Sequence, residues 1–281
     1  MAFTSFKTVF SLVSLFVLAM LHFFFVNDFV SVDNETKIDV LLNWKASLKN
    51  DNQSLLPSWT FLPNNATNAS NNKNVSSNPC SWFGISCNHA GSVIRLNLTN
   101  LGLKGMLHEF SFSSLPNLSF FDLSMNELFG TFPIDISHQS KLIYLDLSYN
   151  NLSGKSPPQI GLLINLVVMH LAKNQLSDSI PLELGHLKSL NDLSLYANHF
   201  HGCIPTSLGN LSYLIDFSLD SNLFLCSIPV SLGNLSNLAY FYLYDNQLSD
   251  SIPPQIGNLT NLIELDIRKV SSLIILENLK S

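Results

Sequence analysis

The sequence predicts an α/β repeat protein, a solenoid in which one short strand from each coil joins a parallel sheet. Three observations support this prediction. Apolar and polar residues alternate, as in Leu-x-Leu, with a period of 24 residues, and such alternation is typical of a strand with one buried side. Each copy ends on a proline. Each copy also has an asparagine at the same position, and these are Asn126, Asn150, Asn174, Asn198, Asn222 and Asn246.

The repeated segment has the pattern of a leucine-rich repeat. KLIYLDLSYNNLSGKSP (141–157) and NLAYFYLYDNQLSDSIP (237–253) fit L-x-x-L-x-L-x-x-N-x-L, and four further copies keep the register between 117 and 229. Each such repeat forms one coil of a solenoid. We therefore predict a right-handed leucine-rich-repeat superhelix, with its parallel sheet on the concave face. It covers residues 93–270, as about seven coils of 24 residues and a degenerate last one.

The alternation also predicts the core. Two apolar residues in each strand should point inward, and each buried side chain of this size contributes about 1.5–3 kcal/mol. The asparagine that follows can donate and accept hydrogen bonds in a turn whose buried backbone groups need partners. We expect the six asparagines to form a structural ladder. The inward pairs are Leu96/Leu98, Phe121/Leu123, Leu145/Leu147, Met169/Leu171, Leu193/Leu195, Phe217/Leu219 and Phe241/Leu243.

Residues 1–32 have the features of a secretory signal peptide. Lys7 precedes an apolar run from Val9 to Val26, and a basic start before an apolar core is typical of such a signal. The run has 18 residues and no clear cleavage site follows it, so a retained membrane anchor is the alternative.

Residues 33–92 should form an N-terminal cap. We expect an amphipathic helix over 35–49, with Trp59 and Trp82 covering the first coil. The stretch 64–78 is rich in Asn and Ser and is expected to be a loop.

At the other end, the pattern stops after Arg268, and residues 271–281 form a degenerate tail. A solenoid needs a polar surface at each end, and no capping unit follows here. We interpret this end as an incomplete array or as the product of a truncated gene.

Composition and motifs exclude several functions. Charged residues make up 12% of the chain and the net charge is −6, so no basic surface for nucleic acid is predicted. Motifs of hydrolases, zinc proteases and nucleotide-binding proteins are absent. His170 has no obvious partner triad for catalysis, and we interpret Asp122 and Asp146 as common repeat residues rather than as a catalytic pair. We predict no enzyme activity, no cofactor and no metal site.

The four cysteines suit an oxidising compartment. Cys80 and Cys87 lie close together before the first strand, and we predict a disulfide between them; a metal site with His89 lacks a fourth ligand. Cys203 and Cys226 lie in adjacent coils but one position out of register. A bridge between them is possible, but the geometry favours two unrelated thiols, with Cys226 replacing a repeat glycine.

Eleven N-x-S/T sequons are candidates for glycosylation if they are exposed in the secretory pathway. Chance is the alternative, because the chain is rich in Asn and Ser. The sequons are Asn34, Asn52, Asn65, Asn68, Asn74, Asn97, Asn117, Asn151, Asn210, Asn234 and Asn258.

Strand residues that alternate with the core should face solvent on the concave side, which repeat proteins use for binding. They form three columns, running from Arg95 to Glu264, from Asn97 to Asp266 and from Thr99 to Arg268. Exposed tyrosines are common at binding hot spots, although they are also common in strands. We hypothesise that a peptide with basic side chains binds at Asp192, Tyr196, Asp216, Asp220, Tyr240, Tyr242 and Tyr244.

Several segments carry a resemblance to a known family. LLNWKASL (41–48), LLPSW (55–59), PCSWFGISC (79–87) and the L-G-N-L-S repeats resemble the ectodomain of plant leucine-rich-repeat receptor-like kinases, above all the male-discoverer-interacting receptor-like kinase subgroup. The likeness extends over essentially the whole chain. It implies an ectodomain that perceives a peptide or pairs with a co-receptor in development or defence, ahead of a membrane helix and a cytoplasmic Ser/Thr kinase.

The kinase activity of that family is not carried over to this chain. Its glycine-rich loop, H-R-D and D-F-G motifs are absent from the 281 residues. We expect a secreted, apoplastic protein, or a plasma-membrane surface protein in a full-length form. Two alternatives use the same fold: a secreted inhibitor of microbial wall-degrading enzymes, similar to polygalacturonase-inhibiting proteins, and a truncated decoy receptor.

Overall fold

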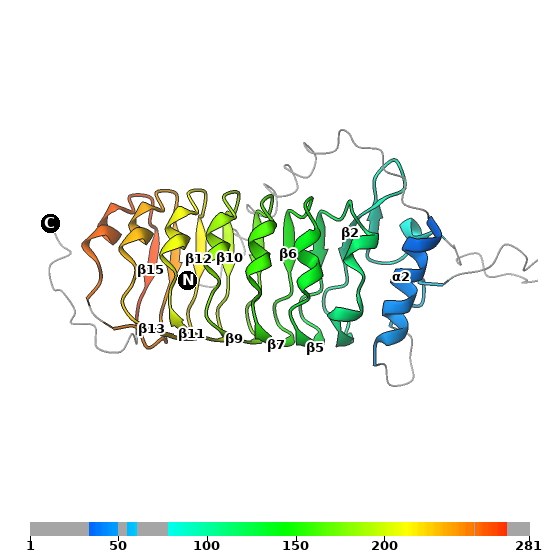
Figure 1. The fold of residues 1–281 in the computed structure, drawn as a ribbon, viewed down its shortest axis with the longest axis horizontal. Coiled ribbons are helices and arrows are strands. Elements are labelled where there is room, and N and C mark those ends of the chain that lie inside the picture. Colours follow the sequence, from blue (N-terminus) through cyan, green and yellow to red (C-terminus); the bar gives the residue numbers. More distant parts are fainter. Residues whose placement is uncertain (1–33, 50–54, 61–77, 250, 269–281) are drawn as a thin grey trace, which may run out of the picture.

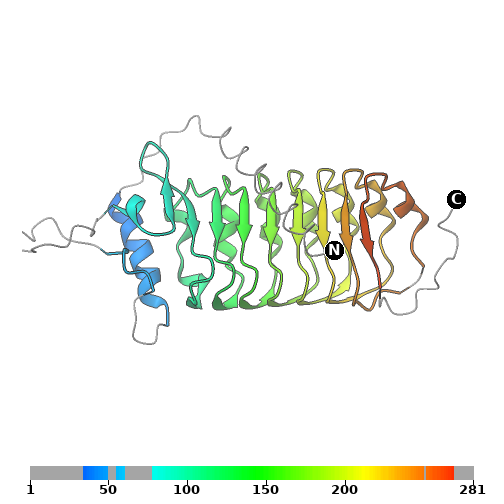
Figure 2. The ribbon, with the colours of Figure 1, turned by 180° about the vertical axis from the view of Figure 1, so that it is seen from behind.

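The computed structural model describes residues 34–49, 55–60, 78–249 and 251–268. Short strands and one-turn helices stack into an elongated array, with helix α2 at one end (Figures 1 and 2). The predicted leucine-rich-repeat solenoid with a helical cap is confirmed. The expected signal peptide, most of the Asn/Ser-rich loop and the expected tail lie outside the described residues.

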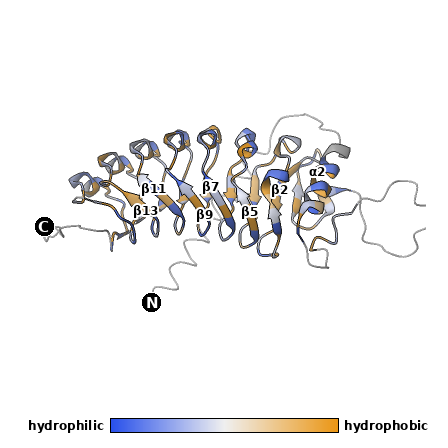
Figure 3. Ribbon diagram, turned by 60° about the horizontal axis from the view of Figure 1, so that its bottom comes forward, coloured by the Kyte–Doolittle hydropathy of each residue, from blue (hydrophilic) through white to orange (hydrophobic). Residues whose placement is uncertain are grey.

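One strand from each coil joins a sheet with the order β1-β2-β4-β6-β8-β10-β12-β14-β15. β1 is antiparallel to β2, and the later neighbours are parallel. The short helices follow the outer side of the curved stack (Figure 3), so this sheet lies on the inner, concave side. The strands are β1 (Ile85–Cys87), β2 (Val93–Asn97), β4 (Phe120–Asp122), β6 (Tyr144–Asp146), β8 (Val168–His170), β10 (Asp192–Ser194), β12 (Asp216–Ser218), β14 (Tyr240–Tyr242) and β15 (Glu264–Asp266).

The predicted inward pairs form the core. All seven pairs, from Leu96/Leu98 to Phe241/Leu243, are at most 2% exposed. Side chains at equivalent positions also pack on one another, as in the rings of Phe217 and Phe241, whose centroids lie 5.3 Å apart. The alternation in the sequence therefore predicted the buried side of each strand correctly.

The ladder asparagines join neighbouring coils. In Asn174, Nδ2 donates to the carbonyl oxygen of Leu147 in the preceding coil at 2.9 Å and to that of Leu171 in its own coil at 3.1 Å. Oδ1 accepts from the backbone amide of Leu152 at 2.9 Å. One buried amide thus satisfies backbone groups that water cannot reach.

The residue before each ladder asparagine has a left-handed backbone, with φ between 51 and 58°. Positive φ is uncommon for residues other than glycine, and the sequence analysis did not predict it. It turns the chain away from the inner sheet at the end of each coil's strand. These residues are Met125, Tyr149, Lys173, Ala197, Ser221 and Asp245.

A second parallel sheet, the lateral sheet, lies on one side of the solenoid and was not predicted. Each of its strands contributes few core residues, such as Leu152 in β7, so the sequence shows little alternation there. Its order is β13-β11-β9-β7-β5-β3. The strands are β3 (Lys104–Met106), β5 (Glu127–Thr131), β7 (Asn151–Lys155), β9 (Gln175–Asp178), β11 (His199–Cys203) and β13 (Leu223–Leu225).

Short 3-10 helices form the outer side. A proline precedes each helix from η4 to η9 and caps it with an extended backbone. The coils approach closely here: a Cβ built at Gly161 would lie 2.5 Å from the carbonyl oxygen of Glu183. The helices are η1 (Pro79–Ser81), η2 (Leu107–Glu109), η3 (Phe112–Ser114), η4 (Ile134–His138), η5 (Pro158–Leu162), η6 (Leu182–His186), η7 (Thr206–Asn210), η8 (Val230–Asn234) and η9 (Pro254–Asn258).

The cap covers the first coil with aromatic side chains. Helix α2 (Asn34–Ser47) buries Trp44 completely, which the sequence analysis did not expect. The rings of Trp59 and Trp82 stack with centroids 5.6 Å apart. A disulfide joins Cys80 to Cys87. The cap is thus both helical and disulfide-linked.

A second disulfide joins Cys203 at the end of β11 to Cys226 in the next coil. The expectation of two unrelated thiols is wrong. Cys226 has a φ of 63°, and Gly130, Gly154 and Gly202 have positive φ at the equivalent position of other coils. This left-handed backbone turns Cys226 out of the strand alternation on which that expectation depended.

Candidate functional site

The residues between the core positions of the inner sheet form the concave surface. The first column runs in register through Asp192, Asp216 and Tyr240, and neighbouring strands lie about 4.8 Å apart. The columns are not exposed throughout. Val168 is only 1% exposed because Ile143, Val167 and Tyr144 pack against it, and the expectation that every column residue faces solvent is wrong there.

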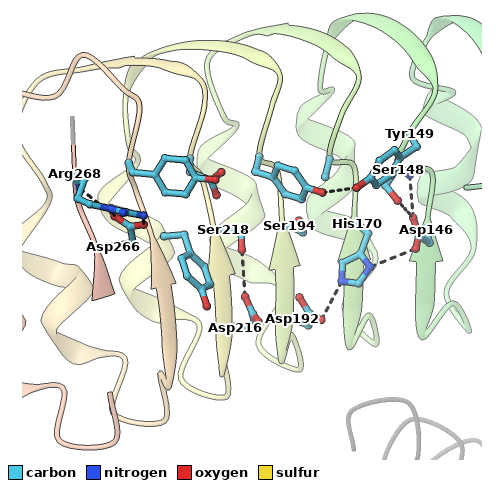
Figure 4. A pocket seen from close by; sticks show the side chains of 15 residues that line it. Asp146, Ser148, Tyr149, His170, Asp192, Ser194, Asp216, Ser218, Asp266 and Arg268 are labelled. Atoms are coloured by element: carbon cyan, nitrogen blue, oxygen red, sulfur yellow. Dashed lines mark hydrogen bonds and ion pairs between the residues drawn. The ribbon is translucent and has the colours of Figure 1, made fainter. Parts of the chain in front are cut away.

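A cavity of about 600 Å³ opens on this surface (Figure 4). Six of the seven predicted ligand-binding residues line it: Asp192, Tyr196, Asp216, Asp220, Tyr242 and Tyr244. Tyr240 lies beside Asp216 in the sheet but outside the lining. The remaining lining residues were not predicted as part of the site, and they are Asp146, Ser148, Tyr149, His170, Ala172, Ser194, Ser218, Asp266 and Arg268.

His170 lies between two carboxylates (Figure 4). Its Nδ1 is 3.3 Å from Oδ2 of Asp146 on β6, and its Nε2 is 2.9 Å from Oδ2 of Asp192 on β10. Neither contact of His170 was predicted. The strand register could have indicated both contacts. Asp146 is the neighbour of His170 in the second column, and Asp192 stands in the first column on the next strand.

The carboxylates keep His170 charged. Burial alone would lower the pKa of His170, but Asp192 and Asp146 raise this pKa well above its ordinary value. Burial would raise the pKa of Asp146, but bonds from His170 and Ser148 hold it below its ordinary value. Both shifts favour the ionised forms. The three side chains therefore form a bridge of two carboxylates and one imidazolium across three coils.

The Asp-Leu-Ser segments have a structural explanation. Oδ1 of Asp146 accepts hydrogen bonds from the backbone amide of Ser148 at 2.9 Å and from its hydroxyl at 2.6 Å. Asp122 and Ser124 repeat this arrangement at 3.0 and 2.7 Å. The aspartate thereby satisfies the backbone at the end of its strand, which explains why this segment recurs.

Asp216 is the least compensated carboxylate of the cavity. Its Oδ1 accepts a hydrogen bond from the hydroxyl of Ser218 at 3.2 Å, and its neighbours in the sheet are Asp192 and Tyr240. Burial and then the charge of Asp192 raise the pKa of Asp216 to about 7. A carboxyl with this pKa is held in a site where its negative charge is poorly satisfied.

The two other aspartates of the cavity have closer partners. Asp220 is 4% exposed, and hydrogen bonds with the hydroxyls of Tyr244 and Ser221 partly offset the rise that burial causes in its pKa. Asp266 accepts two hydrogen bonds from Arg268, at 2.9 Å from Nε and 2.5 Å from Nη2. Arg268 therefore neutralises Asp266.

Four tyrosines line the cavity, and Tyr149 lies at its upper rim (Figure 4). The hydroxyls of Tyr149 and Tyr196 lie 3.0 Å apart, although the residues are 47 positions apart in the chain. Nζ of Lys173 lies 4.8 Å from the centroid of the Tyr149 ring. Tyr149 was not predicted, because its position before a ladder asparagine places it outside the strand columns.

On the concave surface before the cavity, three side chains stack on one another. The guanidinium of Arg95 lies 3.7 Å from the centroid of the Phe120 ring, which stacks on Tyr144 with centroids 4.2 Å apart. This stack partly buries Arg95, and the lining of the cavity begins further along the sheet, at Asp146.

The described segments contain no group of three or more His, Cys, Asp or Glu side chains placed to hold a metal ion. Across the same residues, no helix combines the length and hydropathy that a membrane span requires.

Comparisons with known proteins agree with the fold. The Leucine Rich Repeat family matches residues 141–163, 165–187 and 237–259. MDIS1-interacting receptor like kinase 2 of Arabidopsis thaliana is 47% identical over 94 residues, which are 33% of this chain and 8% of that protein. The ectodomain of the Arabidopsis receptor kinase HAESA, solved with an IDA peptide hormone ligand, has a TM-score of 0.70 at 32% identity and matches 83% of this chain and 37% of its own.

In a third comparison, this chain covers nearly the whole length of the similar protein. A chain of the BIR3–SERK2 complex from Arabidopsis thaliana is 33% identical with a TM-score of 0.54, over 66% of this chain and 92% of that one. The chain belongs to the family of plant leucine-rich-repeat receptor ectodomains. This leucine-rich-repeat ectodomain nevertheless spans only 8% of the length of MDIS1-interacting receptor like kinase 2.

The sequons of the leucine-rich-repeat ectodomain differ in their surroundings. Asn97 accepts a hydrogen bond from the Thr99 hydroxyl at 2.9 Å, and Asn117 accepts one from Lys141 at 2.8 Å. The side chain of Asn34 and the sequons at Asn52, Asn65, Asn68 and Asn74 are outside the described part. The exposed sequons are Asn151, Asn210, Asn234 and Asn258.

Proposed function

We propose that this chain is the ligand-binding part of a plant receptor, and that it binds a peptide with a basic group in the concave cavity. The observation that carries the proposal is the convergence of five aspartates and four tyrosines on one cavity of about 600 Å³. The HAESA ectodomain, which has the same fold, was solved with a peptide hormone ligand. Fold alone does not assign a ligand, so the proposal depends on the residues of this cavity.

The charge balance of the cavity favours a cationic ligand. Five aspartates line it, against His170 and Arg268 as the cationic side chains among the lining residues. Opposite charges interact more strongly in a partly buried site than in bulk water. The tyrosines supply broad contact surfaces that lose little conformational entropy on binding. An extended basic peptide can use both features at once.

The same proposal includes the partners and the location. A receptor ectodomain acts outside the cell, without enzymatic activity of its own, and can pair with a leucine-rich-repeat co-receptor. The BIR3–SERK2 structure is itself a complex of two proteins. The related receptor kinases favour this function over inhibition of wall-degrading enzymes.

Peptide selection tests the proposal. The full chain, secreted from insect cells, is used to select peptides from a random display library, and we expect the selected peptides to contain Arg or Lys. Tyr196→Ala, Tyr242→Ala and Asp220→Ala should each lower the affinity for a selected synthetic peptide at least fivefold, which is about 1 kcal/mol. Tyr213→Ala is the control, because Tyr213 is 61% exposed outside the cavity. Unchanged affinity in all three cavity variants would exclude this site.

A further inference from the structure

We propose that His170 is the internal counter-ion of the cavity: it occupies Asp146 and Asp192, and thereby leaves Asp216 as the carboxylate that binds the cationic group of a ligand. This inference rests on the proposed function. It identifies the residue that binds the cation, and it explains why the other carboxylates of the cavity do not compete with that residue.

The position of His170 between two carboxylates requires both of its ring nitrogens to donate hydrogen bonds. Both ring nitrogens face carboxylate oxygens, at 3.3 Å for Asp146 and 2.9 Å for Asp192. A neutral imidazole has one N–H donor, and its other nitrogen is an acceptor that would face a carboxylate oxygen; only the imidazolium donates from both nitrogens. His170 is also only 8% exposed, so water competes little for these bonds. The carboxylates of Asp146 and Asp192 are thus directed at His170.

The other aspartates of the cavity are also satisfied, except one. Arg268 binds Asp266 through two nitrogens, and the hydroxyls of Tyr244 and Ser221 reach the nearly buried Asp220. Asp216 accepts a bond from Ser218, and no ion pair joins it to a cationic side chain in the described part of the chain.

The surroundings of Asp216 make a ligand cation favourable there. Asp192 is its neighbour on β10 and Tyr240 its neighbour on β14, while the charges of His170 and Asp220 act on it from further away. Burial and the charge of Asp192 raise the pKa of Asp216 to about 7. A cationic group placed beside Asp216 relieves this repulsion, and Asp216 shares the cavity with four tyrosines.

The first experiment measures the cation position. The probes are a synthetic peptide selected by the wild-type chain and a copy in which citrulline replaces its arginine, which removes the charge and keeps the shape. Asp216→Asn should lower the affinity for the arginine peptide at least tenfold and change that for the citrulline copy less than twofold. Equal losses for both peptides would overturn the assignment of Asp216. Asp135→Asn, an exposed position on η4, is the control.

The second experiment tests the counter-ion. In His170→Gln the internal cation is absent, so Asp146 and Asp192 become available to a ligand. A peptide with one additional arginine should then gain at least tenfold in affinity over the selected peptide, while the two peptides should bind the wild type within twofold of each other. His199→Gln is the matched control, because His199 is exposed on β11 in the lateral sheet. If His170→Gln shows the same preference as the wild type, the proposal is wrong.

A third measurement needs no ligand and no variant. Nitrogen-15 NMR of the histidine side chains in the full chain should show both ring nitrogens of His170 protonated at pH 6.5. A neutral His170 at this pH would overturn the counter-ion even if peptides bind. If no peptide is selected while His170 is doubly protonated, the proposed function fails and the internal ion bridge stands, so the two failures are distinguishable.

Discussion

Nε2 of His170 lies 2.9 Å from Oδ2 of Asp192, one strand further along the concave sheet. On its other side the same ring faces Asp146 at 3.3 Å. The three residues connect three consecutive coils through side chains alone. This bridge is a property of the folded state, because the unfolded chain does not hold these residues together, and so it links the stability of the solenoid to pH.

Removing the imidazolium should destabilise the protein most in mildly acidic solution. The folded pKa of His170 is raised, so its contribution is complete below about pH 6.5 and is lost as the pH rises through the raised value. The pKa of Asp146 is lowered, so its contribution is present above about pH 4 and is lost as the pH falls through the lowered value. Between these limits, we expect His170→Gln to lower the free energy of unfolding by about 3 kcal/mol.

Urea unfolding at pH 5.5 and pH 9, followed by circular dichroism, checks this prediction. The difference between wild type and His170→Gln should be larger at pH 5.5. His199→Gln should stay close to wild type at both values, because His199 is exposed and surface substitutions usually change stability by less than about 0.5 kcal/mol. A difference independent of pH would mean that His170 stabilises the fold by packing alone.

Asp216→Asn should stabilise the protein at alkaline pH. The pKa of Asp216 is raised to about 7 by burial and by Asp192, so the folded state binds a proton that the unfolded state releases near pH 4. Stability therefore falls as the pH rises from about 4 to about 7. The variant has no such charge, and it should exceed the wild type in free energy of unfolding at pH 8 and match it at pH 4. Equal curves for the two proteins would contradict the raised pKa.

The fold could be predicted from the sequence because every coil repeats the same local solution. The inner strands were predicted correctly, since two core residues such as Leu145 and Leu147 mark each of them. The lateral sheet was missed, since one core residue in a strand such as β7 leaves no alternation to detect. The disulfide between Cys203 and Cys226 was missed because the left-handed backbone at Cys226 depends on the turn and not on the residue type.

For the candidate site, the sequence predicted only the columns of residues along the concave sheet. Register placed Asp192 and Asp216 side by side, because parallel pairing carries equivalent residues onto neighbouring strands. It did not predict contacts that cross from one column to another, such as that between His170 and Asp192. It also missed Tyr149, which reaches the rim from a turn. Such contacts depend on side-chain length and rotamer, which a pattern of residue types does not contain.

Asn174→Ala should destabilise the solenoid far more than an exposed Asn→Ala substitution. The side chain of Asn174 bonds to the carbonyl oxygens of Leu147 and Leu171 and to the amide of Leu152, all in buried surroundings. A buried backbone group left without a partner costs about 1–3 kcal/mol, so we expect a loss of at least about 2 kcal/mol in free energy of unfolding. Asn165→Ala is the matched control, because Asn165 makes an exposed bond to Ser140. Urea unfolding should separate the two variants, and equal losses would exclude a special role for the ladder.

The disulfide in the lateral sheet should stabilise the two coils that contain Asp192 and Asp216. Cys203 and Cys226 are 23 residues apart, and closing a loop of this length in the unfolded chain corresponds to about 3 kcal/mol. The double variant Cys203→Ser, Cys226→Ser should therefore unfold at lower urea concentration than the wild type. In Cys203→Ser, Cys226→Gly, glycine removes the cost of the left-handed backbone at position 226, and this variant should regain about 1 kcal/mol. If the glycine variant is no more stable than the serine variant, the positive φ at Cys226 exists only because the disulfide imposes it.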